Sequence, residues 1–204
     1  MNIGGLDPVD KDYLDSIKNL VTIIEPRVLS DHLCFQKHGQ RSHYDLLPFP
    51  LNQKHLDNCV QRLEQMQTHL DHKVYIENLC HYIEYQNSDI SEADFIVELC
   101  QKLETKILLD LNNIHLNYLN LDIDYKPYLK IAHELIGQIH IAGGEKSADL
   151  WIDNHGTEPL PEVESMLNSF VKSKIPICYE RDENIPSFQE SLTYLQQLEK
   201  RIMA

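Results

Sequence analysis

Five short apolar runs recur along the chain, and each ends at or next to a carboxylate or an imidazole. The runs occupy residues 28–32, 74–78, 107–110, 139–140 and 175–180. Apolar and polar residues do not alternate in these runs, as they would in a strand with one solvent-exposed face. Continuous apolar runs are typical of parallel strands that are covered by helices on both sides. The pattern therefore predicts five strands, each with a polar side chain at its C-terminal end.

Amphipathic helical patterns separate these runs, and most have a recognisable start signal. The first helix is predicted to start at Asp7, with Pro8 in its first position, and the next two start at Asn52 and Ser91. Three more helices are predicted near residues 124–136, after Pro159, and after a Ser187–Glu190 capping box. The helix after Pro159 is expected to bury Val163, Leu167, Phe170 and Val171. Strands that alternate with such helices indicate βαβ units and a parallel sheet, so we expect one α/β domain over residues 1–204.

Polar side chains at the C-terminal ends of successive strands are typical of the active-site rim of a (β/α) barrel. A closed barrel needs eight strands and about 250 residues, whereas this chain of 204 residues shows five. We therefore expect a TIM barrel that lacks its first three β/α units at the N-terminus. The alternative is a smaller open-sheet α/β fold that is complete as it stands.

The strand ends also supply the candidate chemistry. Side chains two residues apart share a face of a strand, which would direct one polar side chain per strand into a common cavity. These side chains are His32, Glu77, Asp110, His140 and Glu180, and an Asp153-x-His155 pair lies between the last two strands. Carboxylates and imidazoles from several strands are typical ligands of divalent metals, and this many favours more than one ion.

Simpler roles stay open for individual residues. Asp110, within Leu-Leu-Asp-Leu-Asn-Asn, and the segment 153–156 both suit polar turns. The glycines of segment 142–144 would let backbone or substrate approach closely beside His140. The metal hypothesis therefore rests on the joint pattern rather than on any one residue.

Composition narrows the function classes. The formal net charge is −14, which disfavours binding to a phosphate backbone, so no nucleic-acid partner is expected. No apolar run approaches the ~20 residues of a membrane span, and the N-terminus shows no signal-peptide pattern. The five cysteines show no Cys-x-x-Cys spacing, which predicts reduced thiols and a cytoplasmic location. A nucleophile elbow and a phosphate-binding glycine loop are also missing.

Seven motifs in order resemble a known family, the multinuclear non-haem iron-dependent oxidases (MNIO), which are MbnB- and TglH-like. They are Ser30-Asp31-His32-Leu33, the segment 45–50, Ile76-Glu77-Asn78, the segment 108–113, the segment 138–143, the segment 152–156, and the segment 180–186. The resemblance runs from about Gly4 to the C-terminus. It implies a xylose-isomerase-like TIM barrel, and family members carry an N-terminal stretch with the first three strands, which this chain is expected to lack.

The resemblance also implies an activity. Members oxidise cysteine residues of ribosomally made precursor peptides with dioxygen at two or three iron ions, often with a partner protein that presents the peptide. The metal ligands it implies are His32, Glu77, Asp110, Asn113, His140, Asp153, His155 and Glu180. Of these, Glu77, Asp110 and His140 are the catalytic candidates. Asp45 and Arg181 match family motifs as substrate-binding residues or structural supports.

Two other functions remain open at this stage. One is another divalent-metal enzyme of the same barrel class, such as a sugar isomerase or an endonuclease-like enzyme. The other is an inactive truncated barrel that only binds a peptide or partner. Bound iron would distinguish the oxidase from another divalent-metal enzyme. Poor metal retention would favour the inactive barrel.

Overall fold

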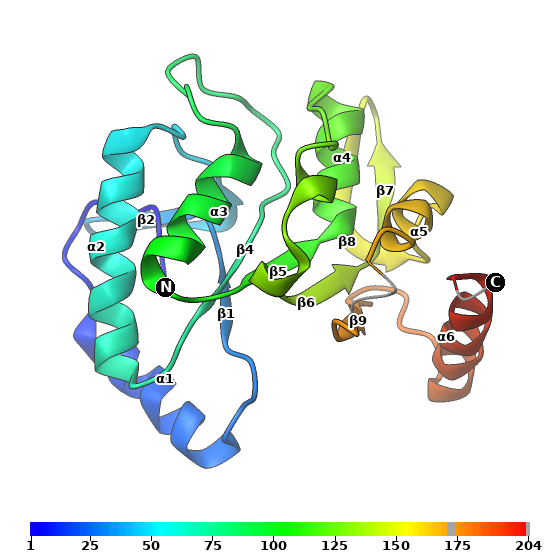
Figure 1. Ribbon diagram of the computed structural model, residues 1–204, viewed down its shortest axis with the longest axis horizontal. Coiled ribbons are helices and arrows are strands. Elements are labelled where there is room, and N and C mark those ends of the chain that lie inside the picture. The colour runs from blue at the N-terminus through cyan, green and yellow to red at the C-terminus, as the bar shows by residue number, and fades with distance from the viewer. Residues whose placement is uncertain (171–173, 203–204) are drawn as a thin grey trace. The chain divides into compact units, whose positions relative to one another are not determined.

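The computed structural model describes residues 1–170 and 174–202, which form two compact units (Figure 1). The first unit comprises residues 1–79 and 83–108, and the second comprises residues 80–82 and those from 109 onward. Val171, one of the expected core residues, lies outside the described residues.

The first unit contains three parallel strands with helices, and an antiparallel hairpin. Its elements are α1 (Lys11–Ile24), β1 (Ser30–His32), β2 (Phe35–His38), β3 (Arg41–Leu47), α2 (Gln53–Leu70), β4 (Tyr75–Glu77), α3 (Glu92–Leu103) and the first two residues of β5 (Ile107–Asp110). Strand β4 pairs in parallel with β1, where Asp31 faces Ile76, and with β5, where Ile76 faces Ile107. The strands β2 and β3 form the hairpin.

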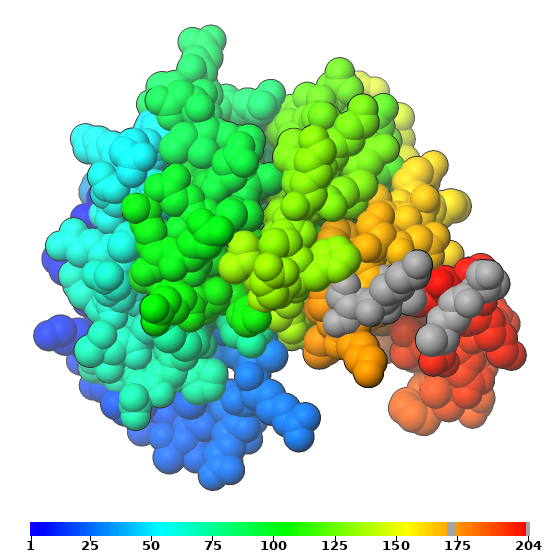
Figure 2. All heavy atoms as spheres, in the orientation of Figure 1, coloured from blue at the N-terminus to red at the C-terminus, as the bar shows by residue number. Residues whose placement is uncertain are grey.

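Helices α2 and α3 supply most of the core of the first unit. Fully buried side chains of this core are Leu56, Leu63 and Met66 from α2, Phe95, Ile96 and Leu99 from α3, and Val74 and Ile76 from the β4 segment. The two helices, cyan and green, cover much of this unit in the space-filling view (Figure 2). The strand ends are therefore held by a packed apolar layer.

The predicted starts of α2 and α3 are confirmed. The side chain of Asn52 accepts a hydrogen bond from the backbone N–H of His55 at 3.1 Å, and Ser91 caps α3 in the same way. The predicted start of the first helix is wrong. Asp10 caps α1, whereas the carboxylate of Asp7 accepts a hydrogen bond from the N–H of Gly39 in the β2–β3 turn.

The second unit contains two parallel strands, helices, and a second antiparallel hairpin. Its elements are the end of β5, α4 (Leu111–Leu121), the 3₁₀ turns η1 (Tyr128–Lys130) and η2 (His133–Leu135), β6 (Ile136–Ile141), β7 (Gly143–Ser147), β8 (Leu150–Thr157), α5 (Pro161–Leu167), β9 (Ile177–Tyr179) and α6 (Phe188–Ile202). Strand β6 pairs in parallel with β9, and β7 pairs with β8.

All five predicted strands are present, but the prediction of a helix near residues 124–136 is wrong. That segment forms η1 and η2, and its last apolar residue, Ile136, begins strand β6. The helix of this region is α4 instead, which follows directly from Asp110. The capping box of α6 is confirmed, since Ser187 and Glu190 exchange hydrogen bonds. No helix among the described residues is both long and apolar enough to cross a bilayer.

Candidate metal centre

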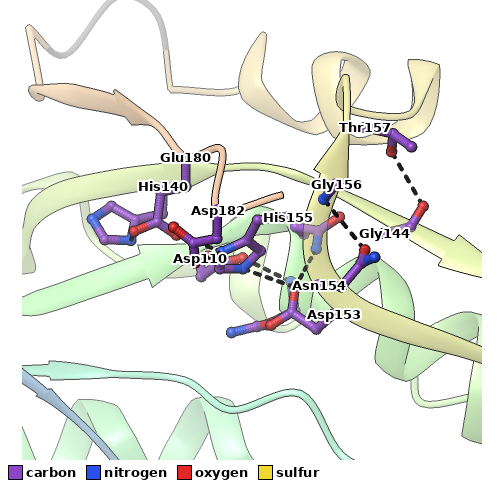
Figure 3. A network of polar contacts seen from close by, with 12 residues as sticks. Asp110, His140, Gly144, Asp153, Asn154, His155, Gly156, Thr157, Glu180 and Asp182 are labelled. Carbon is purple, nitrogen blue, oxygen red and sulfur yellow. Dashed lines mark hydrogen bonds and ion pairs between the residues drawn. The ribbon is translucent and has the colours of Figure 1, made fainter. Parts of the chain in front are cut away.

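Three predicted ligands converge in the second unit: Asp110, His140 and Glu180. Asp110 is the last residue of β5, His140 lies near the end of β6, and Glu180 follows β9 directly. One ligand atom from each lies within 4.8 Å of those of the others, and His140 Nδ1 is 3.1 Å from Glu180 Oε1. Figure 3 shows these side chains projecting toward one another. The strand ends thus place two carboxylates and one imidazole around a common point.

Local structure fixes Asp110 in this position. The residue is 1% exposed, and its Oδ1 accepts a hydrogen bond of 2.7 Å from the backbone N–H of Asn113, which caps helix α4. A capping carboxylate satisfies a backbone donor that the first helical turn leaves without a partner. The turn role that stayed open for Asp110 and the ligand role are therefore compatible.

The Asp153-x-His155 pair on β8 belongs to the same polar network. His155 Nε2 lies 3.0 Å from Asp153 Oδ1, and His155 Nδ1 lies 3.0 Å from Asp182 Oδ2 and 3.7 Å from Glu180 Oε2. Asp153 Oδ1 also accepts a hydrogen bond from Asn112 Nδ2 at 2.7 Å. The β7–β8 hairpin thus brings a second imidazole against the carboxylates (Figure 3).

The charge balance of this network favours a cation. Burial alone would lower the pKa of His155, but the hydrogen bond and charge of Asp153, together with the charges of Glu180 and Asp110, raise that pKa to about 10. Without a metal, the protonated imidazole therefore partly neutralises the carboxylates. A divalent metal would compete with this proton for the same donors.

The donor set fits a divalent metal ion. Carboxylate oxygens and imidazole nitrogens suit iron, manganese and similar ions. Asn113, another predicted ligand, is 2% exposed in the first turn of α4, three residues after Asp110. Asp110, His140 and Glu180 could therefore hold a metal from within the second unit, whereas the ligand roles of Asn113, Asp153 and His155 stay a prediction.

The glycines beside His140 serve close backbone packing. A Cβ on Gly143 would clash with the carbonyl oxygen of Glu158, and one on Gly144 would lie 2.6 Å from that of Ile152. Both contacts are far shorter than van der Waals distance. The glycines therefore allow β7 to pair tightly with β8, the strand that carries Asp153 and His155.

His32 and Glu77 form a pair within the first unit. They face each other in the register of β1 and β4, and His32 Nε2 lies 3.5 Å from Glu77 Oε2. Glu77 is buried, and its role as a ligand and catalytic residue, like that of His32 as a ligand, stays a prediction.

Asp45 and Arg181 occupy different settings. Asp45 is exposed on β3 in the first hairpin. The guanidinium of Arg181 donates hydrogen bonds to the backbone oxygens of Gly156 at 2.9 Å and Asn184 at 2.7 Å. These bonds suit Arg181 as a support of the loop after Glu180. A substrate-binding role stays a prediction for both residues.

Sequence reasoning did not name three neighbours of these ligands as site residues: Asn112, Asp182, and Cys178, whose Sγ lies within 4.8 Å of ligand atoms of His140 and Glu180. Asn112 lies beside a predicted ligand, and Asp182 follows Glu180 by two residues. Cys178 precedes Glu180 by two residues, a spacing that puts both side chains on one face of a strand. That spacing was the available signal for Cys178, whereas the contact between Asp182 and His155 joins segments far apart in the sequence.

Comparisons with known proteins assign this chain to one family. A family model described as "RiPP precursor modification enzyme MbnB/TglH/ChrH" matches residues 1–203. A UPF0276 protein of Anaeromyxobacter sp. (strain Fw109-5) is 32% identical over 189 residues, which cover 91% of this chain and 67% of that protein. A UPF0276 protein of Acaryochloris marina (strain MBIC 11017) is 31% identical over 200 residues, which cover 97% and 72%.

Solved structures show the fold. The apo form of the 3-keto-D-glucoside 4-epimerase YcjR from E. coli matches with a TM-score of 0.54 and 17% identity, over 96% of this chain and 74% of that one. An L-ribulose 3-epimerase matches with a TM-score of 0.58 and 12% identity, over 95% and 63%. The predicted xylose-isomerase-like TIM-barrel class is confirmed by these neighbours. The absence of three barrel units stays a prediction.

Proposed function

Because this chain belongs to the MbnB/TglH/ChrH family of RiPP precursor modification enzymes, we propose that it takes part in the iron-dependent oxidation of cysteine in a ribosomally made precursor peptide. Dioxygen would be the co-substrate, and a partner protein would present the peptide. The observation that carries the proposal is the convergence of Asp110, His140 and Glu180 at three strand ends.

The side chains of the second unit have distinct roles in this proposal. Asp110, His140 and Glu180 would hold the metal, and Asn113, Asp153 and His155 would complete the ligand set. Bound iron would supply the redox chemistry with dioxygen that amino-acid side chains do not provide. His32 and Glu77 are the ligand candidates of the first unit.

Two neighbouring groups would orient these ligands. Asp182 accepts a hydrogen bond from the Nδ1–H of His155 when that nitrogen is protonated, which leaves Nε2 available for a metal. Arg181 fixes the backbone at Gly156 and Asn184 on either side of this contact. Such outer contacts hold an imidazole in one orientation and therefore lower the cost of metal binding.

Metal content of the chain purified without oxygen tests the first half of the proposal. We expect iron in the parent protein, and its loss in His140→Ala and Glu180→Gln. Matched controls are His43→Ala, at an exposed position of β3, and Glu98→Gln, which removes a half-exposed carboxylate on α3 that pairs with Lys102. Loss of iron in the controls, or its retention in both site variants, would contradict the proposed centre.

Mass spectrometry tests the second half. The iron-loaded protein would be incubated with dioxygen and a cysteine-containing precursor peptide encoded beside its gene, together with any encoded partner protein. We expect a mass change confined to cysteine-containing fragments, and none with His140→Ala. Unchanged peptide with a fully loaded protein would argue against the oxidase. Sugar epimerisation by the manganese-loaded protein would point to the activity named for its structural neighbours instead.

A further inference from the structure

Cys178 lies among the candidate metal ligands of the second unit. It occupies the centre of β9, and in the parallel register it faces His140 on β6. Its Sγ, one ring nitrogen of His140 and one carboxylate oxygen of Glu180 all lie within 4.8 Å of one another. The Cys178 thiol is therefore close enough to share a metal ion with His140 and Glu180, the two side chains that join Asp110 in the proposed centre.

The strand geometry accounts for this placement. Cys178 and Glu180 are two residues apart, so they project on the same side of β9. The backbone N–H of Glu180 donates to the carbonyl oxygen of Ile141 at 3.0 Å, which continues the pairing of β9 with β6 through that residue. Three donors, namely a thiol, an imidazole and a carboxylate, are thus fixed by one pair of strands.

The other cysteines are placed differently. Cys34, Cys59, Cys80 and Cys100 are buried, whereas Cys178 is partly accessible. Burial raises the pKa of the Cys34 and Cys59 thiols to about 12, and also raises that of Cys100. Among the described residues, Cys178 is the cysteine that belongs to a cluster of possible metal ligands.

We propose that Cys178 is a thiolate ligand of the metal ion that His140 and Glu180 hold. This inference rests on the proposed metal centre. On binding, the thiol gives its proton to solvent and a sulfur–metal bond forms, with no change in oxidation state. A thiolate favours iron, cobalt or zinc over manganese and magnesium, which prefer oxygen ligands. Cys178 would therefore set the metal preference of the centre.

Cobalt spectroscopy provides a readout that does not depend on activity. The full chain, purified without metal and without oxygen, would be titrated with Co²⁺. We expect an intense near-ultraviolet sulfur-to-cobalt charge-transfer band that saturates at the metal stoichiometry. Cys178→Ala and Cys178→Ser should lose this band and bind Co²⁺ at least about tenfold more weakly, as expected for a disturbed coordination shell. Affinity for Mn²⁺ should change much less.

Cys100→Ala is the matched control, because it removes a thiol from the core of α3 and should keep the band. A band that survives in both Cys178 variants would overturn the inference while leaving the metal centre intact. Co²⁺ binding that survives in both His140→Ala and Glu180→Gln would instead overturn the proposed centre. The two failures are thus distinguishable.

Alkylation of the unaltered protein makes the test independent of variant folding. A maleimide reagent should modify Cys178 in the metal-free protein, and Co²⁺ should slow this reaction at least about tenfold by holding the thiolate. The modified position would be assigned by peptide mass spectrometry. Equal rates at saturating Co²⁺ would contradict the inference.

Discussion

Asp110 and Asn113 are joined by a 2.7 Å hydrogen bond in which the carboxylate that ends β5 also caps helix α4. The same carboxylate takes part in the cluster with His140 and Glu180. One carboxylate therefore both caps α4 and lies among the candidate ligands. The two roles can be separated because asparagine caps helices as well as aspartate does.

Asp110→Asn should keep the stability of the protein but lose the metal, because the cap remains while the ligand charge is removed. Asp110→Ala should lose the metal and also about 1 kcal/mol of unfolding free energy from the lost cap. Urea unfolding and elemental analysis measure the two effects. Asp10→Asn makes the same change at the cap of α1 and should keep the metal. Full metal content in Asp110→Asn would refute the ligand role.

Asp182 and His155 supply a second prediction. His155 Nδ1 lies 3.0 Å from Asp182 Oδ2, so this carboxylate orients the imidazole ring. Asp182→Asn should weaken metal binding about tenfold without changing the fold. The control is Asp149→Asn, in the exposed turn between β7 and β8. Equal affinities of the two variants, measured by competition with a chelator, would show that Asp182 does not act through His155.

The β7–β8 hairpin tolerates no side chain at Gly143. Gly143→Ala would place a Cβ in a clash with the carbonyl oxygen of Glu158 and 2.6 Å from that of Thr157, both backbone atoms. We expect a loss of about 1–3 kcal/mol in unfolding free energy, as for other overpacked positions. Metal should be lost as well, because β8 carries Asp153 and His155. Gly39→Ala, at an open but left-handed position with φ of 56°, should keep the metal.

The capping box of α6 gives a pH-dependent prediction. Hydrogen bonds from the hydroxyl and then the backbone N–H of Ser187 lower the pKa of Glu190. Because the folded-state pKa lies below the unfolded one, this contribution to stability is present above the ordinary range of a glutamate. It is lost as the pH falls through the lowered pKa.

Ser187→Ala removes the hydroxyl donor, so the pKa of Glu190 should rise toward that of an ordinary glutamate. Carboxyl-detected NMR titration of Glu190 in the parent and the variant measures this shift. The stability difference between parent and variant should also shrink in acid. A Glu190 pKa that does not respond to the substitution would contradict the assignment of this hydrogen bond.

The strand ends were predictable because they depend on local sequence. Apolar runs followed by Asp110, His140 or Glu180 mark both the strand and the polar residue at its end, and the structure brings those three residues together. The starts of α2 and α3 were predictable for the same reason, since a cap is made by residues three apart.

Helix α4 was not predictable from propensity. Its first turn holds Asn112 and Asn113, which disfavour helix interiors and suit turns. Their cost is offset by contacts that local sequence does not reveal, such as the hydrogen bond from Asn112 to Asp153. The two hairpins were missed because most of their residues are exposed and carry little apolar alternation, as in Arg41–Leu47.

The three converging ligands come from positions about thirty and forty residues apart along the chain. An ion held by Asp110, His140 and Glu180 would therefore act as a cross-link that closes two long loops, and long loops gain most from closure. Metal occupancy and folding free energy would be coupled. If that ion is the proposed iron, scarcity of iron would lower the abundance of this protein through turnover of its less stable metal-free form.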